Sequence, residues 1–232
     1  LRSNIQLLAD TGLIKTPVNT FPLMWHDIVR DLKVIQLENL TDKQKNAYSY
    51  VNHQLRLAKQ SQKILKTNIA SDNKRFTSYG DSFRDNNSIT FSSSFMTDSL
   101  AVNITSNYTN SPSDDDNVRL DGSYVAAFMG NWVFSAGKQD RWWGPSWDTS
   151  LSLTNNARPM PALAISRKSA IGFELPFTEY SIPWTVTSFM GILDDDRVIN
   201  DALLWGFRLN FKPADNWELG ITRLAQWSGD GR

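Results

Sequence analysis

The sequence of 232 residues contains no cysteine, which excludes disulfide frameworks and thiolate metal sites. It has only two histidines, His26 and His53, and neither has the partner spacing of a metal or catalytic centre. Phosphate-binding and dinucleotide-binding loops and the common hydrolase signatures are also absent. We therefore expect no metal site and no cofactor.

Charge of one sign is not in surplus, because 24 basic side chains balance 24 acidic ones. This balance argues against nucleic acid as a partner, since binding to phosphates requires an excess of basic groups. Apolar runs are also short, and none approaches the roughly 18 residues of a transmembrane helix. The chain starts at Leu1 without a signal peptide and ends in loop-like residues 229–232, so we expect a trimmed chain that continues further.

Residues 1–65 carry apolar side chains at helical spacing. Ile5, Leu8 and Ala9 occupy positions i, i+3 and i+4, as on the buried face of a helix. Thr41 and Gln44 match a capping box, which predicts the start of a long polar helix that extends to about residue 66. The sequence predicts a separate N-terminal helical region.

From residue 66 onward, the apolar side chains repeat every second position, as in β-strands. Leu100, Val102 and Ile104, for example, alternate with more polar neighbours. Many of these runs are longer than soluble strands, which average about five or six residues, and match the roughly 9–11 residues of a tilted strand across a bilayer. About nine strands are predicted: 66–80, 88–96, 100–108, 118–129, 131–138, 164–176, 184–193, 203–211 and 217–226.

Short and long connections between these strands mostly alternate along the chain. The short turns are at 96–99, 130–131, 177–183 and 213–216. The longer loops are at 84–87, 110–117, 139–163, 194–202 and from 227 on, with 84–87 the weakest example. Outer-membrane barrels have short periplasmic turns and long external loops, so this asymmetry favours an external position for the long loops.

Aromatic residues gather beside the short turns, as in the girdle at a membrane interface. They are Phe95, Phe128, Trp132, Phe177, Trp184, Phe211 and Trp217. A soluble β-sandwich with an aromatic core is the alternative, but it would rarely place all these rings at one end. The predicted fold class is mainly β, a transmembrane antiparallel β-barrel preceded by the N-terminal helical region. Because bacterial single-chain barrels have even strand numbers, residues 66–232 are expected to form only the N-terminal half of the barrel.

Residues 140–148, Asp-Arg-Trp-Trp-Gly-Pro-Ser-Trp-Asp, hold three indoles within a single loop. Exposed indoles beside carboxylates and amides are typical of sugar binding, because a pyranose face stacks on the ring while polar groups bind hydroxyls. Alternatively, the rings fold inward as a small hydrophobic core, and Gly144 and Pro145 set a turn. The candidate glycan-binding residues are Asp140, Arg141, Trp142, Trp143, Trp147, Asp148, Asn156, Arg158, Trp227 and Asp230.

Other functions remain open at this stage. Asp140 and Asp148 could form the acid pair of a glycosidase, and the acid runs 114–116 and 194–196 could bind a divalent cation. We favour solvated charge runs and a protein without enzymatic activity. A diffusion channel lined by Asn103, Arg208 and Asn210 is the main alternative, and an enzyme that modifies surface glycan or lipid is a further one.

Three segments together resemble the Wzi family of capsule-assembly outer-membrane proteins. Residues 140–163, with Trp-Trp-Gly-Pro and the later Ala-Arg-Pro, resemble the family signature. Residues 1–14 with Thr20-Phe-Pro-Leu resemble its helical start, and residues 217–232 resemble a mid-barrel strand and loop. The likeness covers the whole chain, although Ser146 replaces a smaller residue found in many relatives.

The resemblance implies an outer-membrane barrel of about eighteen strands with a helical plug on the periplasmic side. It also implies a non-enzymatic surface lectin that binds capsular polysaccharide or exopolysaccharide and supports capsule attachment. We accordingly expect a monomer in the bacterial outer membrane, in contact with its lipid. The sequence does not identify the glycan.

Overall fold

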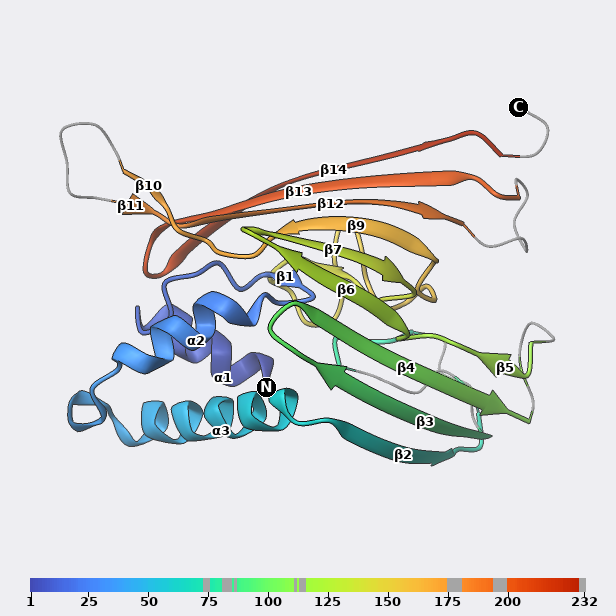
Figure 1. Cartoon of the computed structure of the whole chain (residues 1–232), viewed down its shortest axis with the longest axis horizontal. Helices are drawn as coiled ribbons and strands as arrows, with labels where there is room; N and C mark the ends of the chain where they lie inside the picture. Colours follow the sequence, from blue (N-terminus) through green and yellow to red (C-terminus); the bar gives the residue numbers. More distant parts are fainter. Residues whose placement is uncertain are drawn as a thin grey trace.

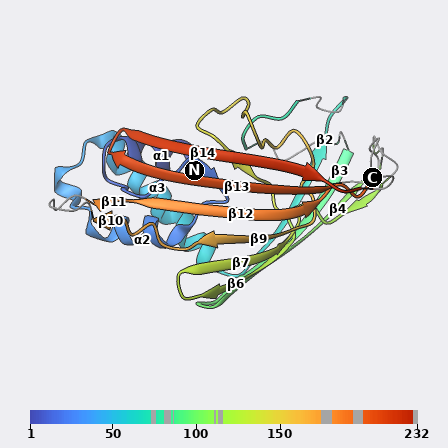
Figure 2. The ribbon, with the colours of Figure 1, turned by 90° about the horizontal axis from the view of Figure 1, so that it is seen from above.

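Three α-helices lie at one end of a long antiparallel sheet in the computed structural model (Figure 1). The structure describes residues 1–72, 76–80, 85, 87–110, 112, 116–174, 181–193 and 200–229. Figure 2 shows that the sheet curves strongly from one edge to the other. No helix within these described ranges is long and apolar enough to cross a membrane.

The helical region contains α1 (Arg2–Asp10), α2 (Trp25–Val34), the short 3-10 helix η1 (Leu37–Asn39) and α3 (Asp42–Lys59). The predicted capping box is confirmed, because Thr41 Oγ1 accepts from the Gln44 amide at 3.4 Å and Gln44 Oε1 accepts from the Thr41 amide at 2.8 Å. The expected extension of α3 to residue 66 is wrong. Residues after Gln60 instead enter the sheet, where a strand gains ladder hydrogen bonds from its neighbour.

One hydrophobic core holds the helices together. Their apolar faces meet so closely that the central side chains have almost no exposed surface. This burial stabilises helices that are otherwise marginal at 9–18 residues. The buried members are Ile5, Leu8, Ala9, Ile14, Val18, Ile28, Leu32, Ala47, Val51 and Leu55.

Nine strands form the main path of the large sheet, in the order β14-β13-β12-β9-β7-β6-β4-β3-β2, which confirms the predicted count. Their bounds are β2 (Gln62–Ile69), β3 (Asn87–Met96), β4 (Leu100–Thr109), β6 (Tyr124–Met129), β7 (Trp132–Gly137), β9 (Ala162–Arg167), β12 (Trp184–Ile192), β13 (Leu203–Ala214) and β14 (Trp217–Trp227). The short β5 (Val118–Arg119) pairs with β4 beside this path, and β10 (Phe173–Glu174) pairs with β11 (Ser181–Ile182).

Three predicted strand ranges need correction. The strand expected at 66–80 is β2 at 62–69, the run 118–129 divides into β5 and β6, and the strand expected at 164–176 ends at Arg167. The division arises at Gly122, whose φ of +90° fits a turn rather than a strand. The alternation of apolar residues locates the strands well. It does not reveal a turn, such as that at Gly122, across which the two-residue alternation continues.

β2 and β14 are the two edges of the sheet, and the described residues show no pairing between them. The nine strands of this path therefore form an open curved wall, as expected for half of a barrel. Alternate residues along each strand face opposite sides of this wall. Ile221 and Trp217 lie exposed on the convex face, whereas Arg208, Asn210 and Lys212 are buried on the concave face.

The helices share their end of the sheet with the short β3–β4, β6–β7 and β13–β14 turns (Figure 1). The loop expected at 84–87 is in fact part of a long connection from Ile69 to Asn87. This connection therefore fits the alternation of short turns and long loops better than the sequence predicted. The connection between β9 and β12 is not a short turn, because it contains β10 and β11. The turn expected at 177–183 lies partly outside the described residues.

The aromatic girdle is only partly as expected. Phe95, Trp132 and Trp217 are exposed on the convex face beside the short turns. Phe128 instead faces inward and packs beside Val133, because the register of β6 and β7 places it on the concave side. Phe177 lies outside the described residues.

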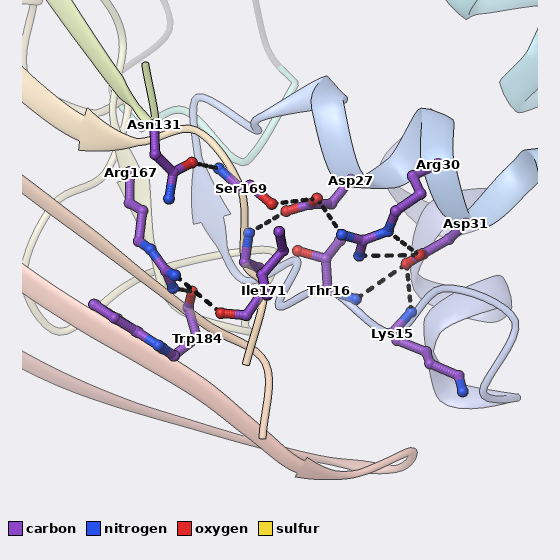
Figure 3. A network of polar contacts seen from close by, with 11 residues as sticks. Lys15, Thr16, Asp27, Arg30, Asp31, Asn131, Arg167, Ser169, Ile171 and Trp184 are labelled. Carbon is purple, nitrogen blue, oxygen red and sulfur yellow. Dashed lines mark hydrogen bonds and ion pairs between the residues drawn. The ribbon is translucent and has the colours of Figure 1, made fainter. Parts of the chain in front are cut away.

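Of two buried carboxylates of α2, Asp27 binds the connection between β9 and β12, whereas Asp31 binds the segment that follows α1 (Figure 3). Asp27 accepts hydrogen bonds from the Ser169 hydroxyl at 2.9 Å and from the Ala170 amide, and it pairs with Arg30 at 2.8 Å. Asp31 accepts from the Lys15 amide at 2.8 Å. A buried carboxylate with several donors holds its partners in a defined geometry, so α2 is fixed against the β9–β12 connection.

The segment that follows α1 crosses the concave face and contacts β13 and β14. Glu218 accepts from the amides of Val18 at 2.8 Å and Asn19 at 2.9 Å. Lys212 Nζ donates to the carbonyls of Ala9 and Ile14, each at 2.7 Å. The polar inner wall thus binds the backbone of the N-terminal segment, and residues 11–24 are called the plug below.

Candidate functional site

The Trp-rich loop (residues 138–161) leaves β7 and turns toward the concave side of the sheet. Within it, β8 (Trp142–Trp143) pairs antiparallel with β1 (Thr20–Phe21) of the plug, with Phe21 opposite Trp142. The Thr20 hydroxyl in turn accepts from Arg208 and Asn210, each at 2.7 Å. The two-residue pairing of β1 with β8 therefore joins the loop to the plug, and the hydrogen bonds to Thr20 join the plug to the barrel wall.

Trp142 and Trp143 are 1% and 2% exposed, so neither offers a ring face to a ligand from outside. This burial corrects their predicted role as exposed stacking platforms and matches the alternative of an inward-folded core. Trp143 packs edge-on against Phe189 of β12 with ring centroids 5.4 Å apart. Gly206 lies opposite Phe189 and leaves the space that this ring occupies. Burial of these rings fixes the loop against the wall.

Arg141 is likewise buried, although it was predicted as a glycan ligand. Its guanidinium lies over the Phe189 ring at 4.6 Å and donates to the Gln139 carbonyl at 3.1 Å. Burial lowers the pKa of Arg141 to about 10, and the charge of Asp140 partly opposes this shift. Arg141 therefore serves as an internal cation that packs the start of the loop.

Arg2 of α1 is surrounded by aromatic rings and holds the tip of the loop. Its guanidinium lies 4.4 Å from the Tyr79 ring centroid and 4.6 Å from that of Trp147, with Phe21 and Trp142 next nearest. It also donates to the carbonyls of Gly144 at 3.0 Å and Pro145 at 2.7 Å. Burial lowers the pKa of Arg2, and the nearby Tyr79 and Glu218 oppose that shift.

Gly144 and Pro145 have the structural role predicted for them, because both carbonyls accept hydrogen bonds from Arg2. Gly144 has a φ of +154°, a conformation that residues with a Cβ rarely adopt. A Cβ there would also lie 3.2 Å from the Ser150 hydroxyl oxygen. The Trp-Trp-Gly-Pro signature thus encodes a buried pair of rings followed by the turn that Arg2 grips.

Residues 77–79, from the connection between β2 and β3, lie along the Trp-rich loop. The Thr77 hydroxyl donates to the Asn155 carbonyl at 2.6 Å, and the Thr77 amide donates to Asn156 Oδ1 at 3.1 Å. The Tyr79 amide donates to the Trp147 carbonyl at 2.9 Å. Burial raises the pKa of Tyr79 to about 12, against the effect of Arg2, so its hydroxyl stays protonated at neutral pH.

Arg158 closes the other end of the loop through two carboxylates. Its Nη2 contacts both oxygens of Asp85 at 2.9 and 3.1 Å, and its Nη1 lies 3.1 Å from Asp121. Burial acts to lower the pKa of Arg158, but the hydrogen bonds and charges of Asp85 and Asp121 outweigh it and raise that pKa. Arg158 therefore stays charged and joins three separate connections.

Four of the predicted glycan ligands are exposed on the loop. Trp147 is 42% exposed, although its ring contacts Tyr79 edge-on at 5.8 Å and lies against Arg2. Asp140, Asp148 and Asn156 are also exposed. The loop thus combines a buried anchor with a polar outer part that carries one half-exposed indole.

Trp227 does not join this group. Strand register pairs it with Leu203 on β13, and the alternation of β14 places it on the convex face with Ile221. The Trp-rich loop lies on the concave side, so Trp227 was wrongly grouped with it. A shift of one residue along β14 would move a side chain to the other face of the sheet. The residues around Trp227 do not by themselves show which face it occupies. Asp230 lies outside the described residues.

A cavity of about 480 Å³ separates the Trp-rich loop from the inner face of β2–β4. Three predicted residues, Asp140, Trp142 and Arg158, line it, together with groups that no sequence pattern connected to them. The lining residues are Phe21, Pro22, Ile64, Lys66, Tyr79, Gly80, Asp85, Thr90, Ser92, Thr105, Asn107, Asp121, Asp140, Trp142, Asn155 and Arg158.

Acidic residues do not gather into a metal site among the described residues, where no group of three or more potential ligands is found. Asp114, Asp115 and the run 194–196 lie outside the described residues. Asp116 is placed, and it lies 3.7 Å from Arg119 Nη1. The interpretation of these runs as solvated charges remains a prediction.

Comparison with known proteins gives two relatives that span the whole chain. A Klebsiella pneumoniae protein, described as an uncharacterized 55.8 kDa protein in the cps region, is 27% identical over 243 residues that cover 100% of this chain and 46% of the relative. A solved Escherichia coli structure has a TM-score of 0.90 at 23% identity and covers 100% of this chain and 52% of that one. It is described as Wzi, an outer-membrane protein involved in group 1 capsule assembly and a carbohydrate-binding β-barrel.

The chain spans about half the length of both relatives. The structural likeness establishes the fold, an antiparallel sheet with N-terminal helices that corresponds to about half of that barrel. In addition, residues 56–232 match the family described as capsule assembly protein Wzi. The match includes the Trp-rich loop and every strand from β2 to β14. The chain therefore belongs to the Wzi family of capsule assembly proteins.

Proposed function

We propose that this chain is part of a monomeric outer-membrane β-barrel that binds capsular polysaccharide or exopolysaccharide at the cell surface, without chemically changing it. Membership of the capsule assembly family supports this role. The description of the similar E. coli protein as a carbohydrate-binding outer-membrane barrel supports it further. The apolar convex face, with its exposed aromatic residues, suits contact with lipid.

The observation that carries the proposal is the position of Trp147. Its indole is 42% exposed, and contacts with Arg2 and Tyr79 hold it in place. A ring fixed before binding loses little conformational freedom when a pyranose stacks on it. Trp147 is therefore the stacking platform we propose, in place of Trp142 and Trp143.

Polar groups near this ring complete the proposed site. Asp148 follows Trp147 directly, and exposed Asn156 accepts a hydrogen bond from the Thr77 amide, which orients its side chain. Carboxylates and amides accept and donate hydrogen bonds to sugar hydroxyls. The site combines one apolar platform with several polar partners, as sugar binding requires.

The diffusion-channel alternative is less well supported by this half of the barrel. Arg208 and Asn210, two of its proposed pore-lining residues, bind Thr20 of the plug. Asn103 donates to the Gly122 carbonyl at 2.7 Å. We expect the full-length protein to show no stable conductance in planar bilayers, since its inner wall is engaged with its own chain.

Replacing Trp147 with alanine should weaken polysaccharide binding about tenfold, because the loss of one stacking ring costs roughly 1–3 kcal/mol for a stacked nucleic-acid base and we expect the lower part of that range for a pyranose face. Binding of surface polysaccharide by the purified full-length protein measures this effect. Trp217→Ala is the matched control, since Trp217 is also exposed but lies beside the β13–β14 turn. Equal losses in both variants, or no loss in Trp147→Ala, would contradict the proposed platform.

A further inference from the structure

We propose that the cavity beneath the Trp-rich loop is a second sugar subsite, which takes an uncharged terminal or branch residue of the polysaccharide. This inference rests on the proposed function and adds the class of sugar that the inner site accepts. It concerns the space between the loop and β2–β4, and does not involve the exposed ring of Trp147.

The size and shape of the cavity suit a small saccharide. Its volume of about 480 Å³ falls within the roughly 300–1,000 Å³ of small-molecule sites. One wall carries the partly buried aromatic side chains of Phe21 and Tyr79. Such a wall suits the apolar face of a pyranose, which exposes axial C–H groups.

The opposite wall is polar and is formed by the inner faces of β3 and β4. Thr90 donates to Asn107 Oδ1 at 2.8 Å, and the hydroxyls of Ser92 and Thr105 lie 2.9 Å apart. These bonds fix the side chains while hydroxyls and amides keep further capacity for hydrogen bonds. A wall of this kind can bind the hydroxyl edge of the sugar that faces away from the rings.

Charge in the described lining favours an uncharged sugar over an acidic one. Asp85 and Asp121 are both bound to Arg158, so that cation is already neutralised. Asp140 and Lys66 then add one charge of each sign. A uronic acid would bring its carboxylate to a lining with three acids and two bases, without a surplus cation to offset the loss of hydration.

A filling substitution tests the subsite. Ser92→Phe places a ring in the cavity, whereas Ser93→Phe, the matched control, places it on the convex face of the same strand. D-galactose, D-glucose, D-mannose and D-glucuronate are the probes, followed by saturation-transfer NMR on the full-length protein in detergent. Asn107→Leu is a second variant that removes an amide from the wall with little change in size.

We expect at least one neutral sugar to bind the wild-type protein, and D-glucuronate to bind about tenfold more weakly or not at all. Ser92→Phe and Asn107→Leu should each weaken neutral-sugar binding about tenfold, while Ser93→Phe leaves it unchanged. Undiminished binding in Ser92→Phe, equal binding of D-glucuronate, or no binding of any probe would overturn the subsite.

The two proposals fail in distinguishable ways. Trp147→Ala should lower polysaccharide binding but retain the neutral-sugar signal, because that ring lies outside the cavity lining. If the polysaccharide binds and no monosaccharide does, the subsite is wrong and the proposed function stands. If monosaccharides bind and the polysaccharide does not, the proposed function is wrong.

Discussion

Replacing Arg2 with alanine should free the tip of the Trp-rich loop, at a cost of about 3 kcal/mol to its docked state. Arg2 supplies two hydrogen bonds to the Gly144 and Pro145 carbonyls and a cation among four aromatic rings. Its removal leaves an acceptor at the buried Gly144 without that donor and opens space between the rings. Trp147 would lose the support that keeps its ring in place.

Amide hydrogen exchange measures the opening of this loop directly. Because the tip opens locally, its protected amides should exchange about 100-fold faster in the variant, while those of β13 and β14 keep their rates. The control is Arg56→Ala, which removes an exposed arginine from α3. Unchanged exchange at residues 142–147 would show that the β1–β8 ladder holds the loop without Arg2.

Replacing Arg158 with methionine should destabilise the closed loop by roughly 3–5 kcal/mol, because it leaves a buried carboxylate unpaired. Asp85 is only 4% exposed and binds Arg158 through both oxygens. Without this partner, the buried carboxylate of Asp85 loses both hydrogen bonds that it receives from Arg158.

The double variant Arg158→Met with Asp85→Asn provides the control, since it removes the charge as well as its partner. It should be more stable than Arg158→Met alone, as judged by thermal unfolding of the full-length protein at pH 7. A double variant that is as unstable as the sum of the two single variants would show that the pair is not coupled.

The sequence predicts the sheet well because its evidence is local. Two-residue alternation follows directly from strand geometry, so Leu100, Val102 and Ile104 report the face of β4 without any tertiary knowledge. The capping box at Thr41 is equally local and is also confirmed. The open sheet and the helices beside the short turns follow from strand number and loop length.

The candidate site is predicted only in outline, because its contacts join distant parts of the chain. The burial of Trp142 depends on the pairing with Phe21, and the grip on Gly144 depends on Arg2, which lies 142 residues away. No periodicity links these positions. Trp-rich composition correctly marks the loop, but it does not separate rings that anchor it, such as Trp143, from the one that remains exposed.

The sequence did not reveal three residues that contact the Trp-rich loop, which are Tyr79, Asp85 and Asp121. Each is a single polar or aromatic residue in a connection, without a motif around it. Only the fold brings the β2–β3 connection, with Tyr79 and Asp85, and the β5–β6 turn, with Asp121, to Trp147 and Arg158 of the Trp-rich loop. A parity count along β14 would have placed Trp227 on the convex face, so that error was avoidable from the sequence.

The most direct test of the account uses the absence of cysteine from the chain. A single Asp148→Cys replacement in the full-length protein puts one thiol beside Trp147, and Asn216→Cys puts one in the β13–β14 turn at the opposite end of the sheet. On intact cells, a membrane-impermeant maleimide should label Asp148→Cys and not Asn216→Cys, and added surface polysaccharide should protect the labelled thiol. Labelling of Asn216→Cys alone, or labelling of Asp148→Cys that polysaccharide does not reduce, would contradict the account.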